Sequence, residues 1–177
     1  MATTSATSAA VLSGLIHVDQ AGVCLFSTEG HRFALDTAAV GEVTTTMAML
    51  PVPMVPRPVL GLFNLRGTPV AVVDLLVLLG VRQTPVSASR AGTTLLVLRT
   101  DRPIAALRID RLETVLPQGS GRRVLLDESG VHAAQVGLFE PPAGGPAAIL
   151  LGARPLLASL LKLGLSDNQR GDHEPAL

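Results

Sequence analysis

Short runs of apolar and β-branched residues, most of them closed by glycine or proline, follow one another along the chain. This pattern is typical of small all-β domains built from several short strands. The runs at 23–27 and 31–35 flank Glu29-Gly30 and predict a hairpin. Further strands are expected at 40–46, at 60–73 around a turn at 64–67, at 93–100, at 104–109 with 112–116 as its bent continuation, and at 147–151.

A proline-rich stretch and a short helix interrupt this strand pattern. Residues 50–58 contain four prolines, and proline lacks the N–H that a central strand needs, so an extended connection is expected there. Asp74 has the side chain of a good N-cap, and the apolar residues 75–79 after it predict one short helical turn that ends at Gly80.

A second helix is expected near the C-terminal end. Pro155 suits a first helical turn, and the leucines that follow it form one apolar face. Lys162 suits the last turn, where a cation is favoured, and Gly164 is expected to end the helix. Of the leucines, Leu157 and Leu160 are predicted to be the most costly to truncate.

The length of 177 residues and the absence of a long linker predict one domain, residues 15–165, made of two sub-domains that share a core. Residues 1–14 are predicted to be a disordered leader and residues 166–177 a flexible tail. No apolar stretch reaches the length of about 20 residues that a spanning helix needs. The sequence therefore predicts a cytoplasmic protein without direct membrane insertion.

Composition narrows the classes of partner. The chain has 47% hydrophobic residues but no Trp, no Tyr and four Phe, which predicts an aliphatic core and argues against stacking on nucleic-acid bases. The formal net charge is zero, yet residues 54–123 carry ten Arg against four acidic residues. This surplus indicates either a basic face for an acidic partner or a solvated surface on which the charges cluster.

The sequence lacks a set of polar groups that would converge into an active site. Cys24 lies in an alternating strand without an identifiable base, and the four histidines have no metal-ligand spacing. We therefore expect a binding protein that is not an enzyme and that uses no metal and no cofactor. Two alternatives stay open: a thiol-dependent sensor or enzyme that uses Cys24, and a free-standing β-barrel that binds a small ligand.

Residues 59–67, with the sequence VLGLFNLRG, are followed by an apolar strand that ends in Asp74-Leu75 and by a short helix. This stretch resembles the signature of the CheW-like chemotaxis coupling proteins. Other segments fit the same family: the Val-x-Glu-Val strand at 40–43, the proline-spaced entry at 50–58, the stretch at 106–115, and the strand and leucine helix at 148–163. The resemblance covers residues 20–163.

The resemblance implies a mostly β fold of two small five-stranded barrels, similar to Src-homology barrels, packed together. It implies an adaptor that couples the cytoplasmic tip of chemoreceptors to the regulatory domain of a CheA-type histidine kinase. Such an adaptor can be recruited to membrane-bound receptor arrays and has no nucleic-acid partner. The partner-binding residues that it implies are Asn64, Leu65, Arg66 and Gly67 of the signature, together with Glu42 and Val43. An outward guanidinium at Arg66 can pair with carboxylates of a partner; alternatively it only ties the turn to Asp74 or to a local carbonyl.

Four features depart from the family pattern. Ala71 replaces a common Pro, Leu76 replaces a common basic residue, Gly152 replaces a common Asp and so removes a helix cap, and residues 117–146 match weakly. These departures favour a divergent paralogue that serves a specialised chemosensory array. A separate alternative stays open, in which the fold is the same but the partners are exchanged, for example a kinase without a classical receptor.

Three methionines near the prolines allow two roles. Met47, Met49 and Met54 could form an adaptable groove for a partner, or they could fill the core.

Overall fold

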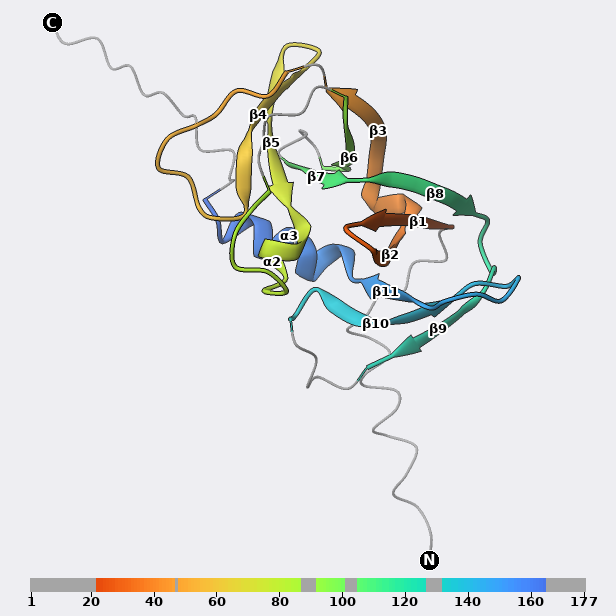
Figure 1. Ribbon diagram of the computed structural model, residues 1–177. Helices are drawn as coiled ribbons and strands as arrows, with labels where there is room; N and C mark the ends of the chain where they lie inside the picture. Colours follow the sequence, from red (N-terminus) through yellow and green to blue (C-terminus); the bar gives the residue numbers. More distant parts are fainter. Residues whose placement is uncertain (1–21, 47, 87–91, 101–104, 127–131, 165–177) are drawn as a thin grey trace, which may run out of the picture.

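The computed structural model describes residues 22–46, 48–86, 92–100, 105–126 and 132–164, and most of their regular structure is β-strand (Figure 1). The strands form a six-stranded and a five-stranded sheet. The predicted mostly β fold class is confirmed, although one sheet has six strands where five were expected. The leader and tail predictions for residues 1–14 and 166–177 lie outside the described residues.

The six-stranded sheet has the order β8-β1-β2-β11-β10-β9. Its strands are β1 (Val23–Thr28), β2 (His31–Asp36), β8 (Arg111–Leu116), β9 (Arg122–Leu125), β10 (Gln135–Glu140) and β11 (Ala148–Leu151). The predicted hairpin is confirmed, because β1 and β2 pair antiparallel around Glu29 and Gly30, both of which have positive φ. The pattern of residues 117–146 did not predict β9 and β10.

The five-stranded sheet has the order β3-β6-β7-β5-β4, so β3 and β4 are its outer strands. Its strands are β3 (Val40–Thr46), β4 (Val59–Leu65), β5 (Thr68–Asp74), β6 (Thr93–Leu98) and β7 (Ala105–Ile109). The predicted pairing of the runs at 93–100 and 104–109 is confirmed as the antiparallel pair β6 and β7. The segment after β3 returns to β4, where Leu50 and Leu62 exchange two backbone hydrogen bonds.

The described residues contain three helical elements: η1 (Thr37–Ala39) between β2 and β3, α2 (Leu75–Leu78) after β5, and α3 (Ala153–Leu161) after the last strand, β11. As predicted, Asp74 caps α2, because its Oδ1 accepts hydrogen bonds from the N–H groups of Leu76 and Val77. The N-cap of α3 is Gly152, which has no side chain to offer. A Cβ at Gly152 would lie 2.7 Å from Cγ1 of Val136 and 2.8 Å from Cγ of Pro155, so close packing accounts for the missing cap.

The chain crosses from the six-stranded to the five-stranded sheet between β2 and β3, and it returns at Asp110. The strand expected to continue over 112–116 is β8, which follows β7 after this single residue (Figure 1). It does not stay in the five-stranded sheet, because it pairs with β1 of the other sheet. The predicted bend is therefore the crossing from one sheet to the other.

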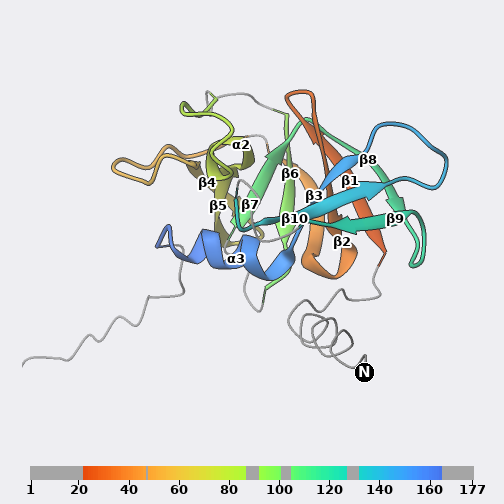
Figure 2. The same cartoon turned by 90° about the horizontal axis from the view of Figure 1, so that it is seen from below.

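One apolar cluster is shared by both sheets and by the helices. Phe26 and Phe33 of the six-stranded sheet belong to the same cluster as Leu96 and Leu107 of the five-stranded sheet. The helix α3 spans the two sheets in Figure 2 and adds Leu156 and Leu160 to this cluster. Each sheet also has a smaller cluster of its own.

The prediction for the leucine helix is half correct. Leu160 is fully buried, but Leu157 is only half-buried, and Leu156 takes the second buried position. Leu76, which departs from the family pattern, is buried in the shared cluster. A basic side chain at this position would lose its hydration.

We propose that the two sheets form one cooperative unit, because the largest apolar cluster contains residues of both. Thermal unfolding should then give one transition, with equal calorimetric and van't Hoff enthalpies. Two well-separated transitions would contradict the proposal. A variant with a cavity in the shared cluster, Leu107→Ala, should shift the whole transition and leave its shape unchanged.

Candidate partner-binding surface

The family-like signature forms the tight turn between β4 and β5. Leu65 pairs with Thr68, so Arg66 and Gly67 form a two-residue hairpin loop. Both have positive φ, 51° and 91°, as a type I′ turn requires. The side-chain oxygen of Asn64 accepts a hydrogen bond from the Gly67 N–H at 2.6 Å. The turn thus explains the sequence Asn-Leu-Arg-Gly locally: Asn64 closes the loop and Gly67 permits its backbone conformation.

The turn holds Arg66 toward solvent at the edge of the five-stranded sheet. Its side chain is 78% exposed, and its Nη2 lies 2.6 Å from Oε2 of Glu42, which is 29% exposed on β3. Because Glu42 lies on one outer strand and Arg66 follows the other, this ion pair joins opposite edges of the sheet. The alternative that Arg66 binds Asp74 is wrong, because Asp74 has other partners.

A groove of about 370 Å³ lies beside this ion pair. Its lining comes from β3, β6 and the β4–β5 hairpin, and comprises Gly41, Glu42, Leu65, Arg66, Thr68, Val97, Leu98, Arg99 and Thr100. The groove therefore has a polar, charged rim and short apolar walls. It can accept a projecting side chain of a protein partner, with Arg66 available for a carboxylate.

Most of the predicted site residues gather here. Glu42, Leu65 and Arg66 line the groove, while Asn64 and Gly67 shape the turn that carries Arg66. Val43 is the exception: it follows Glu42 in β3, and successive side chains of a strand point to opposite faces. It is partly exposed and is not among the lining residues.

No local sequence pattern marked Arg99, which also lines the groove. This residue directly follows β6, and its guanidinium donates hydrogen bonds to the Val40 carbonyl at 3.1 and 3.2 Å. The neighbouring β3 strand pairs with β6 at this point, so Arg99 reaches the groove through sheet pairing. Only the register of the two strands reveals the contact.

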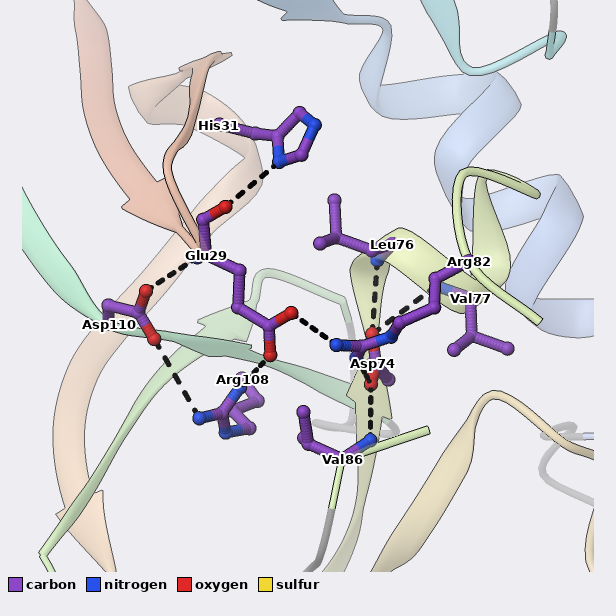
Figure 3. A network of polar contacts seen from close by, with 9 residues as sticks. All are labelled: Glu29, His31, Asp74, Leu76, Val77, Arg82, Val86, Arg108 and Asp110. Atoms are coloured by element: carbon purple, nitrogen blue, oxygen red, sulfur yellow. Dashed lines mark hydrogen bonds and ion pairs between the residues drawn. The ribbon is translucent and has the colours of Figure 1, made fainter. Parts of the chain in front are cut away.

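A second polar network lies where the two sheets meet (Figure 3). Its centre is Arg82, whose guanidinium pairs with Glu29 from the β1–β2 turn and with Asp74 from the end of β5. Arg108 of β7 approaches Glu29 at 3.5 Å, and the Glu29 N–H donates to Asp110 at 2.5 Å. The network thus connects both sheets and the crossing residue between them.

Hydrogen bonding to Arg82, aided by its charge and that of Arg108, lowers the pKa of Glu29 below its ordinary value. A carboxyl group with a lowered folded-state pKa stabilises the fold at a pH above its unfolded pKa. This contribution is lost as the pH falls through the folded-state pKa. The effect is screened by solvent, because Glu29 lies near the surface.

Ion pairs between distant segments compensate part of the uneven distribution of charge along the sequence. Several arginines of residues 54–123 pair with acidic residues of the flanking segments: Arg66 with Glu42, Arg82 and Arg108 with Glu29, Arg122 with Glu140, and Arg123 with Asp36. The basic surplus of the middle segment is therefore partly neutralised on folding. It does not translate directly into one basic face.

The environment of Cys24 argues against thiol chemistry. The side chain is buried in the shared apolar cluster, and this burial raises the pKa of the thiol to about 11. At neutral pH the group is protonated, and a protonated, buried thiol is a poor nucleophile.

In the described part of the chain, no helix is both long and apolar enough to cross a membrane.

Comparisons with known proteins concern both the sequence and the fold of the chain. No curated protein sequence matches the chain. The fold is similar to the crystal structure of the scaffolding protein TtCheW from Thermoanaerobacter tengcongensis, with a TM-score of 0.60, 20% sequence identity, and coverage of 74% of this chain and 88% of that one. A sequence profile described as the CheW-like domain matches residues 22–118, and the chain therefore belongs to the CheW-like domain family.

Proposed function

We propose that the protein is a non-enzymatic chemotaxis adaptor that couples chemoreceptors to a CheA-type histidine kinase in the cytoplasm. Family membership supports a scaffold or adaptor role in chemotaxis. The observation that carries the finer proposal is the position of Arg66, held outward by a family-like turn beside an open groove. Such an adaptor works by contact alone: it raises the local concentration of one partner near the other.

Arg66 can contribute to this contact because only part of its guanidinium is engaged. One nitrogen contacts Glu42, and the exposed remainder can bind a carboxylate of the receptor tip or of the kinase regulatory domain. Closure of the groove by the partner would remove water from this pair and strengthen it. Glu42 would then hold the guanidinium in a defined orientation.

Arg66→Glu should weaken partner binding by about 2 kcal/mol, because it reverses the charge that faces the partner carboxylate and adds repulsion to Glu42. The fold should persist, since the side chain lies outside the core. The measurement is affinity for the purified kinase regulatory domain and for the receptor tip at low and high salt, together with the thermal midpoint. Higher salt should reduce the difference between wild type and variant.

Arg122→Glu is a matched control, because Arg122 is also an exposed arginine, 71%, in an ion pair on a strand. It should leave both affinities unchanged. Equal affinities for wild type and Arg66→Glu would overturn the role of Arg66 as a contact. A collapsed thermal midpoint for Arg66→Glu would instead assign this residue a structural role.

A further inference from the structure

The strand β3 contains one residue more than its partner β6 where it borders the groove. Val40 lies opposite Leu98, but Glu42 lies opposite Val97. Gly41 is therefore the extra residue of a β-bulge, which we call the Gly41 bulge. Bulges disrupt the ladder locally and redirect nearby side chains. The Gly41 bulge thus affects the direction in which Glu42 points.

The bulge explains why Val40 and Glu42 face opposite sides of the five-stranded sheet. In a regular strand, residues two positions apart share a face. Val40 instead packs against the apolar cluster that both sheets share, whereas Glu42 lines the groove with Val97. A Cβ at Gly41 would lie 3.3 Å from the Val97 carbonyl oxygen, which is a tight contact, so glycine suits this position. The extra residue allows β3 to serve the core and the groove within three residues.

Arg99 holds the chain at the start of the bulge. Its backbone N–H donates to the Ala39 carbonyl at 2.8 Å. Its guanidinium donates to the Val40 carbonyl through Nη2 at 3.1 Å and through Nε at 3.2 Å. Two successive carbonyls before Gly41 are therefore bound by one residue. Because a bulge interrupts the regular ladder, these bonds add order where strand pairing is weakened.

We propose that Arg99 is a positioning residue for the Arg66–Glu42 pair, because it holds the Gly41 bulge in the shape that directs Glu42 toward Arg66. The proposal rests on the proposed function, in which Glu42 orients Arg66 for a carboxylate of the partner. The competing role is a direct contact of the Arg99 charge with the partner, since Arg99 also lines the groove. Positioning depends on the hydrogen bonds of Arg99 and not on its charge, so substitutions separate the two roles.

The test compares Arg99→Met with Arg99→Gln in the full chain. Methionine removes every side-chain donor, whereas Nε2 of glutamine lies as many bonds from the backbone as Nε of arginine and can donate to the Val40 carbonyl. Nitrogen-15 relaxation of the Arg66 Nε measures how well that side chain is ordered. We expect Arg99→Met to lower the Arg66 order parameter to the value found in Glu42→Gln. Arg99→Gln should keep it close to the wild-type value.

Affinity for the receptor tip and for the kinase regulatory domain is the second readout. Where Arg66→Glu weakens binding, Arg99→Met should weaken it about fivefold, which corresponds to one hydrogen bond. Arg99→Gln should weaken it less than about twofold. Arg122→Met is the matched control, because Arg122 is an exposed arginine on β9 of the other sheet. It should leave the affinities and the Arg66 order parameter unchanged.

Three outcomes would overturn the positioning role. The first is an unchanged Arg66 order parameter in Arg99→Met. The second is an equal loss of affinity in Arg99→Met and Arg99→Gln, which would assign a charge contact to Arg99. The third is loss of the folded state in Arg99→Met, which would make Arg99 a structural residue. The proposed function fails separately: unchanged affinities in Arg66→Glu would overturn the Arg66 contact, while the order parameters would still decide whether Arg99 positions the pair.

Discussion

Asp74→Ala should lower the free energy of unfolding by about 2–4 kcal/mol, because it removes a helix cap, worth about 0.5–2 kcal/mol, and leaves a further N–H and one Arg82 nitrogen without their acceptor. The Asp74 side chain is only 4% exposed. Its Oδ1 caps α2, and its Oδ2 accepts a hydrogen bond from the Val86 N–H at 3.1 Å and pairs with Arg82. The alanine variant leaves all of these donors without their acceptor.

Two variants separate the cap from the ion pair. Asp74→Asn keeps an oxygen that can cap the helix but removes the charge. It should therefore lower the free energy of unfolding less than Asp74→Ala does. Glu29→Gln removes the charge of the more exposed partner of Arg82 and should cost less than about 1 kcal/mol. Denaturant unfolding at 25 °C measures all three variants. A loss below 1 kcal/mol for Asp74→Ala would show that water replaces the carboxylate and that the network adds little.

The sequence predicted best those features whose partners lie within a few residues. The Asn64–Gly67 turn and the Asp74 cap each close over three residues or fewer, so their residue types identify them. The departure at Gly152 was also visible in the sequence. Its cause was not, because Val136 of β10 occupies the space that a side chain would need.

The contacts between distant segments could not be predicted in this way. Arg82 pairs with Glu29, 53 residues earlier in the chain, and nothing in its local sequence marks it. The Arg66–Glu42 pair depends on how two outer strands of one sheet approach each other. Both contacts follow from the topology of the sheets, which a single sequence does not specify.

The strands β9 and β10 were missed for a different reason. In β9 the burial pattern does not alternate between core and solvent, because the strand lies at the edge of its sheet. In β10 the glycine at 137 weakens the strand pattern. A Cβ at Gly137 would lie 2.2 Å from the Val124 carbonyl oxygen, so this glycine allows β9 and β10 to pair.

The leucine helix shows the limit of a periodic pattern. In α3, Leu156 and Leu160 lie four positions apart, and so do Leu157 and Leu161. Either pair can form the buried stripe of a helix, and the two stripes differ by about 100° of rotation. The structure buries the first pair and leaves Leu161 49% exposed, because the two sheets meet along that face.

Leu160→Ala should therefore destabilise the protein by about 2–5 kcal/mol, since it opens a cavity in the cluster that both sheets share. Leu161→Ala is the matched control: the same substitution, one position along the same helix, should cost less than about 1 kcal/mol because this side chain is half exposed. Denaturant unfolding of the two variants measures the difference. Leu157→Ala should lie between them, because Leu157 packs against the cluster without being buried in it. Equal decreases in the free energy of unfolding for Leu160→Ala and Leu161→Ala would mean that α3 does not pack through the face that carries Leu156 and Leu160.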